Sequence, residues 1–338
     1  MVTRRTDRQR PRLLTAAHNR GGPDSGERLR IVFFGTPSFA VPTLERLLDS
    51  THAVVGIVTQ PDRARGRGQK VTLAPVKALA VAREVPILQP ERLSQADFAA
   101  AFASLRADLA VVAAYGKILP EWLLGAPRLG TINVHASLLP KYRGAAPIHR
   151  AIMAGETATG VTIMRIVKAL DAGPMLARVV TSIGPDETSV EVEHHLAALG
   201  ADLLLESVGG LIRGGLTETP QNDSEATFAG RLTREDGLVD WTRPVRAVHD
   251  QVRGLHPWPH AFTFLDSARF ILHRTRVGDH EPLASPGMVV HRGSSGLAVV
   301  CGDRRLLDVL EIQAEGRRVM PAHAFLAGYA LEPGRQFR

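Results

Sequence analysis

An asparagine and a histidine stand two residues apart in a segment, residues 131–140, that reads Thr-Ile-Asn-Val-His-Ala-Ser-Leu-Leu-Pro. Residues two apart share a face of a β-strand, so Asn133 and His135 would point the same way. Such a pair is suited to acyl transfer, because the amide can hold a developing oxyanion while the imidazole manages protons or also donates to that oxygen. The alternative is an ordinary strand end that has both residues by chance, and the pair by itself favours that alternative.

An acid that could serve the histidine lies further along the chain, in the run Leu-Asp-Ala-Gly-Pro of residues 170–174. Glycine and proline would fix a loop that presents Asp171. An aspartate close to His135 would orient the imidazole ring. A solvated turn aspartate is the commoner fate of such a turn, so this segment also needs support from elsewhere.

The elements that must position these residues alternate between strand and helix. Short apolar runs predict strands at 29–34, 54–58, 85–88, 108–114, 131–134 and 161–167. Helical patterns are predicted at 38–48 (with Ser38 as N-cap), 76–83 and 188–213. This alternation predicts an α/β domain with a mostly parallel, doubly wound (Rossmann-like) sheet, in which ligands bind beyond the carboxyl ends of the strands.

The second half of the chain has a different pattern. After a polar stretch, short strands are predicted at 261–265, 269–276, 287–291, 297–300 and 306–311, preceded by a helix at 244–252. We therefore predict four parts: a disordered basic N-terminal arm (1–28), a catalytic domain (29–213), a linker (214–231) and a smaller C-terminal antiparallel β-barrel, OB-like (232–338).

Composition and charge exclude several classes of protein. The single cysteine, Cys301, rules out an internal disulfide and a cysteine-built zinc site, and it is typical of a reducing cytoplasm. The sequence contains no run of about 18 apolar residues, so no membrane span is predicted. The net charge is +7, but residues 1–30 hold eight arginines against three acids, so five of those charges lie there. That arm could contact RNA, be a transit peptide, or reflect a wrongly assigned start; we favour the last.

Nucleotide and metal sites are not expected. The first strand is followed by Gly35-Thr-Pro-Ser38, which lacks the second glycine of a dinucleotide fingerprint and has a proline without an N–H. His194 and His195 are adjacent in a helical stretch and face different ways, so they make a poor metal pair. We expect neither a metal nor a nucleotide cofactor.

Taken together, the motifs resemble the folate-dependent formyltransferase family. The residues in common are Asn133-x-His135-x-Ser-Leu-Leu-Pro140, Tyr142-Arg-Gly-Ala-Ala-Pro-Ile148, Gly160-Val-Thr-Ile163 and Leu170-Asp171-x-Gly173. The resemblance implies a catalytic role for Asn133, His135 and Asp171. It also implies 10-formyltetrahydrofolate as co-substrate, in a pocket lined by Ser137, Leu138, Leu139 and Pro140.

Other motifs resemble the branch of that family that acts on initiator methionyl-tRNA. They are Phe34-Gly-Thr-Pro37, Thr59-Gln-Pro-Asp62, Gly66-Arg-Gly68, Ala74-Pro-Val-Lys77, Val239-Asp-Trp241 and His256-Pro-Trp-Pro259. The resemblance places a tRNA-contacting insertion at a glycine-rich basic loop that contains Arg63, Arg65, Arg67 and Lys70. It also implies that the C-terminal barrel, residues 232–338, binds tRNA. The chain departs from the family at Val167, Ala169 and Arg231, which leaves the catalytic set intact.

The resemblance implies formyl transfer without a covalent enzyme intermediate. The methionyl amine attacks the formyl carbon, Asn133 and His135 hold the oxyanion, and Asp171 orients His135 and helps to relay the proton. The competing hypotheses are an amino-sugar (sugar-nucleotide) formyltransferase of the same family and a catalytically inactive RNA-binding relative. We expect a cytoplasmic monomer.

Overall fold

The computed structural model describes residues 12–14, 27–62, 64–65, 70–280, 284–292, 296–329 and 331–338. The chain divides into two compact units. The first comprises Met1–Ala145, Thr159–Ser182 and Glu193–Phe228; the second comprises Ala146–Ala158, Ile183–Val192 and Ala229–Arg338. The predicted boundaries at 213 and 232 stay a prediction.

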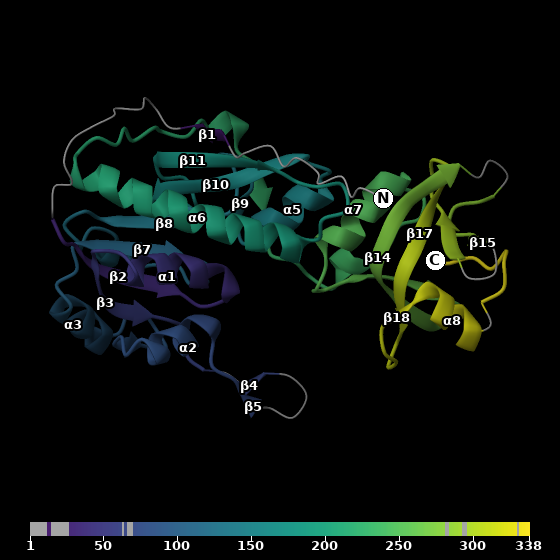
Figure 1. The fold of residues 1–338 in the computed structure, drawn as a ribbon, viewed down its shortest axis with the longest axis horizontal. Coiled ribbons are helices and arrows are strands. Elements are labelled where there is room, and N and C mark those ends of the chain that lie inside the picture. Colours follow the sequence, from purple (N-terminus) through teal and green to yellow (C-terminus); the bar gives the residue numbers. More distant parts are fainter. Residues whose placement is uncertain are drawn as a thin grey trace, which may run out of the picture. The chain divides into compact units, whose positions relative to one another are not determined.

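A mixed β-sheet forms the centre of the first unit (Figure 1). Its strand order is β1-β11-β10-β8-β7-β2-β3-β6. The strands β8, β7, β2, β3 and β6 are parallel, which confirms the mostly parallel α/β fold. The bounds are β1 Arg12–Leu14, β2 Arg30–Gly35, β3 Ala53–Val58, β6 Ile87–Leu88, β7 Leu109–Ala113, β8 Thr131–His135, β10 Ala158–Arg165 and β11 Met175–Ser182.

Two features of this sheet differ from the prediction. Strand β10 runs antiparallel to β8, and the strand β11 was not predicted at all. An apolar run has the same appearance in either strand direction, so composition does not distinguish them. In addition, β1 pairs with β11 inside the arm that was predicted to be disordered, and for these three residues that prediction is wrong.

Helices connect and cover the strands. In the first unit they are η1 Ser38–Ala40, α1 Val41–Leu48, α2 Pro75–Ala82, α3 Ala96–Ser104, α4 Glu121–Leu124 and most of α6 Ser189–Ile212. The helix α5 Pro147–Met153 belongs to the second unit. Ser38 is not an N-cap: Ala40 precedes α1 without a side-chain cap, and the Ser38 hydroxyl donates to Glu193 Oε1 at 3.3 Å. The short elements β4 Ala64–Arg65, β5 Lys70–Val71, β9 Arg143–Gly144, η2 Asp223–Glu225 and β12 Phe228–Ala229 lie in the connections.

Helix α6 runs along one face of the sheet (Figure 1). A Cβ at Gly200 would lie 2.9 Å from Val134 of β8, so this glycine permits close packing of the helix on the sheet. Within the described residues α6 is the one helix long and apolar enough to cross a membrane by length and composition, and half of its most apolar stretch is buried in the protein. The core helix of a globular domain has the same properties.

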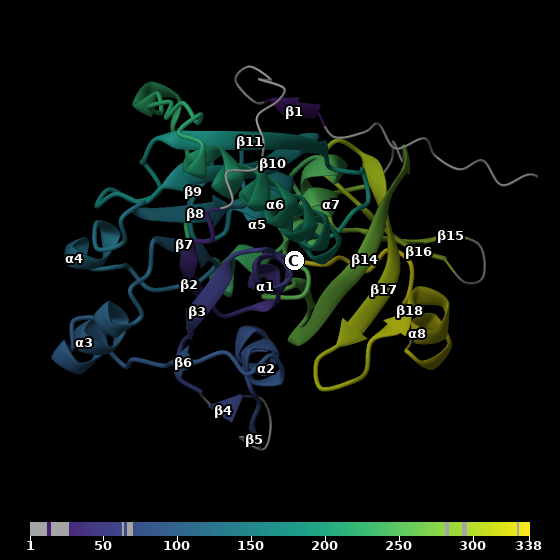
Figure 2. The same cartoon turned by 60° about the vertical axis from the view of Figure 1, so that its left-hand side comes forward.

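The second unit contains an antiparallel sheet in the order β13-β14-β17-β16-β15, with β18 beside β17. The long strands β14 and β17 lie side by side in both views (Figures 1 and 2). The antiparallel C-terminal sheet is confirmed; among the described strands no pairing closes it into a barrel. The bounds are η3 Glu235–Gly237, α7 Val245–Gly254, β13 Ala261–Leu265, β14 Ala268–His280, β15 Val289–Arg292, β16 Gly296–Val300, β17 Arg305–Ala314, β18 Met320–Pro321 and α8 Ala322–Gly328.

Candidate active site

Strand β8 places the asparagine and the histidine. It lies between β7 and β10, with Asn133 opposite Val112 on one side and Met164 on the other. Strand alternation puts the side chains of Asn133 and His135 on the same face. His135 is 5 % exposed, whereas Asn133 is half-buried. Among the described residues the Asn133 amide has no hydrogen-bond partner, so it is free to donate to a ligand.

The structure brings Asp171 to His135. The Asp171 Oδ2 atom lies 3.8 Å from His135 Nδ1 and accepts the Gly144 N–H at 2.8 Å. Strand β10 ends with Arg165, which lies opposite Ile132 of β8. Ile132 is three residues, or about 10 Å, away from His135 along β8. The chain after β10 must therefore fold back over β8, so Asp171 reaches His135 through its loop and not through a shared strand edge.

Gln221 holds that returning loop. Its Nε2 group donates to the carbonyl oxygens of Asp171 and Gly173, each at 2.8 Å. Its Oε1 atom accepts from the Arg143 guanidinium at 2.8 and 3.0 Å. A Cβ at Gly173 would lie 1.9 Å from the Arg165 carbonyl oxygen, so only glycine fits. Gln221 lies in the segment predicted to be a linker, where polar composition gave no signal of this role.

The opposite nitrogen of the His135 ring is engaged by the backbone. His135 Nε2 lies 3.0 Å from the Tyr142 carbonyl oxygen. A carbonyl can only accept, so Nε2 bears the proton, and in the neutral ring the Nδ1 lone pair faces Asp171. Tyr142 has a left-handed φ of 60° and its N–H donates to Thr227 Oγ1 at 2.8 Å. This second anchor from the predicted linker fixes the carbonyl that orients the ring.

The Ser137–Pro140 turn follows His135 directly and is pinned to β10. The Thr162 hydroxyl donates to the Ser137 carbonyl at 2.7 Å and accepts the Leu139 N–H at 3.2 Å. Leu139 is fully buried, while Leu138 is half-buried. The folate pocket expected at this turn stays a prediction, and Leu138 is the residue at which it can be tested without disrupting the core.

Loops after β2, β3 and β7 converge at the carboxyl edge of the parallel strands. The Tyr115 carbonyl accepts from Gln60 Nε2 at 2.8 Å and from the Thr36 hydroxyl at 3.4 Å. Gly116 follows with a φ of 81°, which glycine adopts readily. Burial raises the pKa of Tyr115 to about 12. The Tyr115 carbonyl thus joins the motif of residues 34–37 to the motif of residues 59–62. The sequence around Tyr115 did not indicate this role.

The basic loop is anchored at its base. The Lys77 ammonium contacts the Asp62 carboxylate and donates to Gln89 Oε1 at 2.7 Å. The hydrogen bond from Lys77 holds the pKa of Asp62 below its usual value. The loop itself contains the short antiparallel strands β4 and β5. Arg63 and Arg67 lie outside the described residues, as do the side chains of Arg65 and Lys70, so their predicted RNA contacts stay a prediction.

Comparison with protein families gives two matches that together span most of the chain. Residues 29–208 match the formyl transferase family, and residues 231–330 match the formyl transferase C-terminal domain.

Similar full-length proteins and solved structures agree. A methionyl-tRNA formyltransferase of Acidobacterium capsulatum is 46% identical over 307 residues, which cover 90% of this chain and 98% of the relative. One of Geobacter sulfurreducens is 46% identical over 306 residues, covering 90% of this chain and 96% of the relative.

The N-formyltransferase of Helicobacter canadensis, solved with folinic acid and dTDP-3-aminofucose, has a TM-score of 0.62 at 15% identity and covers 83% of this chain and 98% of that one. HypX of Aquifex aeolicus, solved with tetrahydrofolic acid, has a TM-score of 0.60 at 17% identity, covering 92% and 49%. The two structures show a shared fold.

Proposed function

This chain belongs to the formyl transferase family, and we propose that it transfers a formyl group from 10-formyltetrahydrofolate to the amino group of initiator methionyl-tRNA. The observation that best supports this acceptor is identity over nearly the whole chain. Methionyl-tRNA formyltransferases are 46% identical over 90% of it. The N-formyltransferase of Helicobacter canadensis, solved with the amino-sugar nucleotide dTDP-3-aminofucose, is 15% identical. The product, formylated initiator methionyl-tRNA, would be used to start translation.

The geometry around His135 supports separate roles for His135, Asp171 and Asn133 in the transfer. In its neutral form, the His135 ring has its proton on Nε2 and its lone pair on Nδ1, 3.8 Å from Asp171. As the methionyl amine attacks the formyl carbon, Nδ1 takes the proton that the amine must lose. The imidazolium so formed lies beside the Asp171 carboxylate, which stabilises it. Asn133 donates to the formyl oxygen as negative charge develops there. When the tetrahedral intermediate collapses, the bond between the formyl carbon and N10 of the folate breaks, and the imidazolium returns its proton to that nitrogen, which releases tetrahydrofolate.

The donor binds beside this constellation. The Ser137–Pro140 turn adjoins His135 in the sequence and is held rigid by Thr162. We place the pterin and formyl end of the folate against this turn, with Leu138 as its accessible apolar contact. Formyl transfer from a folate needs no covalent enzyme intermediate, so no serine or cysteine nucleophile is required.

The acceptor tRNA binds to the basic loop of residues 63–70. The loop lies between the carboxyl end of β3 and the start of α2, at the same edge of the parallel strands as the end of β8. Cations at this edge can pair with phosphates of the acceptor stem while its aminoacyl end meets the formyl donor. We propose that the protein acts as a monomer in the cytoplasm.

One assay tests the proposed function. The purified chain is supplied with 10-formyltetrahydrofolate and either charged initiator tRNA or a nucleotide-linked amino sugar, and the formylated product is measured. We expect formyl-methionine with the tRNA and no formylated sugar. Formylation of the sugar alone would assign the chain to the other branch of the family, and no product with either acceptor would indicate an inactive relative.

A further inference from the structure

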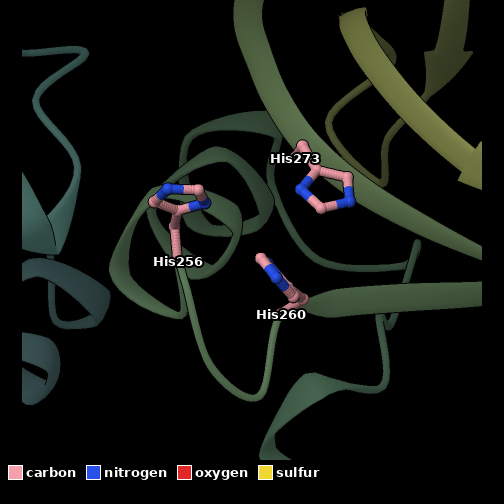
Figure 3. A group of neighbouring side chains, drawn as sticks. All are labelled: His256, His260 and His273. Atoms are coloured by element: carbon pink, nitrogen blue, oxygen red, sulfur yellow. The ribbon is translucent and has the colours of Figure 1, made fainter. Parts of the chain in front are cut away.

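Three histidines of the second unit meet at one point. His256 and His260 lie in the turn between α7 and β13, and His273 lies on β14. Each offers one ring nitrogen, and these nitrogens all lie within 4.8 Å of one another. The rings of His260 and His273 are 4.4 Å apart between centroids, and those of His256 and His260 are 5.4 Å apart. Figure 3 shows the three rings around a common space.

Two nitrogens of this cluster are buried without a partner. His256 Nδ1 and His260 Nδ1 are both inaccessible and make no hydrogen bond among the described residues. A buried polar atom that makes no hydrogen bond loses its hydration without compensation, so native proteins rarely leave two of them side by side. A bound group that accepts both lone pairs would remove this cost.

The third ring is held in the tautomer that a cation requires. Gln313 Nε2 donates to the Arg317 carbonyl at 2.7 Å, which directs Gln313 Oε1 toward His273 Nε2, 2.9 Å away. Because an amide oxygen can only accept, His273 Nε2 bears the proton and Nδ1 keeps its lone pair. A ligating histidine typically donates its other N–H to such an orienting acceptor.

Backbone and surrounding charges also fit a site. His260 has a φ of 66°, in the left-handed region that favours glycine, so the imidazole stands at a backbone position that most other residue types avoid. The nearby cations are engaged elsewhere. Arg269 stacks 4.0 Å over the Phe262 ring, and Arg274 pairs with Glu191 at 3.2 Å. The centre of the cluster is therefore lined by imidazole nitrogens.

We propose that His256, His260 and His273 bind one divalent transition-metal cation such as Zn²⁺, through one nitrogen each. Imidazole suits such cations, and Zn–N bonds of about 2.0–2.1 Å require only that the rings close inward from their present separation. A water completes the tetrahedron. The cation links the 256–260 turn to β14 and so stabilises the second unit. The sequence predicted no metal, because His273 is thirteen residues from His260 and reaches it only through strand pairing.

Zinc binding to the untagged full-length chain tests this proposal. Calorimetric titration with Zn²⁺, and metal content after desalting, should show one cation per chain, and Zn²⁺ should raise the unfolding temperature. His260→Gly and His273→Gln should each weaken binding at least a hundredfold and abolish the thermal shift. His323→Gln, which removes an exposed histidine of α8, is the matched control and should behave as the parent.

His260→Gly also separates loss of the ligand from loss of the fold. It gives the left-handed backbone position its favoured residue, so the metal-free variant should unfold at the same temperature as the metal-free parent or higher. A parent that binds no Zn²⁺ would overturn the proposal. So would a His260→Gly variant that binds Zn²⁺ as tightly as the parent, because the cation would then be bound elsewhere.

Discussion

Histidines are brought together with polar groups in two regions of this molecule, and the surroundings give them different chemistry. In the first unit, one imidazole faces a carboxylate, with Asp171 Oδ2 3.8 Å from His135 Nδ1. In the second, three imidazoles face one another. A ring beside a carboxylate can take up a proton and be stabilised as a cation. Rings that face each other resist protonation and are suited to a metal.

The pKa values of two clustered histidines support this contrast. Burial, followed by the proximity of His273 and His256, lowers the pKa of His260 to about 4. Burial is also the main reason why the pKa of His256 is below its usual value. Both pKa changes favour the neutral form of the ring. Local surroundings, more than residue type, decide what each histidine can do.

The largest expected effect lies on the carboxylate side of the comparison. His135→Ala and Asp171→Ala should each lower kcat by about a hundredfold or more, the usual scale for a positioned acid–base group. Formyl transfer to charged tRNA at saturating substrates measures this. His194→Ala, on the exposed face of α6, is the control. Turnover near that of the parent in His135→Ala would remove the proposed chemical role of the ring.

We propose that the basic loop of residues 63–70 selects the acceptor of the first region. Replacing Arg63, Arg65, Arg67 and Lys70 with Ser should raise KM for tRNA by tens of fold. The slope of log affinity against log salt should also fall by about 3, since each phosphate contact contributes about 0.7–0.9. Binding measured at two salt concentrations gives the slope.

A matched charge control comes from the opposite edge of the sheet, where the helices after β2, β3, β6 and β7 end. It replaces four cations there with Ser: Arg46, Arg83, Arg106 and Arg128. This variant has the same net charge as the loop variant but should keep most of the parent's slope. Equal losses in both variants would mean that overall charge, and not the loop, attracts the RNA.

The folate side of the first region predicts a smaller effect. Leu138→Asp should raise KM for 10-formyltetrahydrofolate about tenfold, because a charge would replace an apolar contact with the pterin. Affinity for tRNA should stay that of the parent. We choose Leu138 because Leu139 is fully buried, so a charge there would unfold the turn. Loss of tRNA binding with folate binding intact would place the pocket elsewhere.

The smallest effect tests how firmly Asp171 must be held. Gln221→Leu removes two hydrogen bonds to the loop, at the Asp171 and Gly173 carbonyls. Each is worth about 1 kcal/mol, but the loop keeps other contacts. We expect kcat to fall about three- to tenfold with little change in either KM. Asn222→Ala is the neighbouring control. A change in KM alone would argue that Gln221 shapes binding and not the position of Asp171.

Local patterns in the sequence predicted much of the first region. The spacing of Asn133 and His135 placed both on one face of β8, and apolar runs located most strands within a few residues. Strand direction was not predictable, because β10 is apolar whether it runs parallel or antiparallel. The return of the Asp171 loop depends on Gln221, and the orientation of the His135 ring depends on Thr227 through Tyr142. A polar segment without periodicity reveals neither role.

The second region was predicted as a helix followed by a small barrel of antiparallel strands, and no metal site was expected in it. His256 appeared in a motif with two prolines, and His260 and His273 had no motif of their own. Their meeting depends on the register in which Ala261 pairs with Leu272, so the cluster is a product of tertiary structure. Such sites are found from coordinates, whereas strand-end pairs can be read from a sequence.

A crossed measurement on two variants tests the central claim, that the two regions perform separate chemistry. Formyl transfer to charged tRNA and Zn²⁺ binding are both measured for His135→Ala and His260→Gly. We predict that His135→Ala loses transfer by about a hundredfold or more and binds Zn²⁺ as the parent does, while His260→Gly loses Zn²⁺ and keeps the transfer rate. Loss of both activities in either variant, or loss of transfer in His260→Gly alone, would contradict the account.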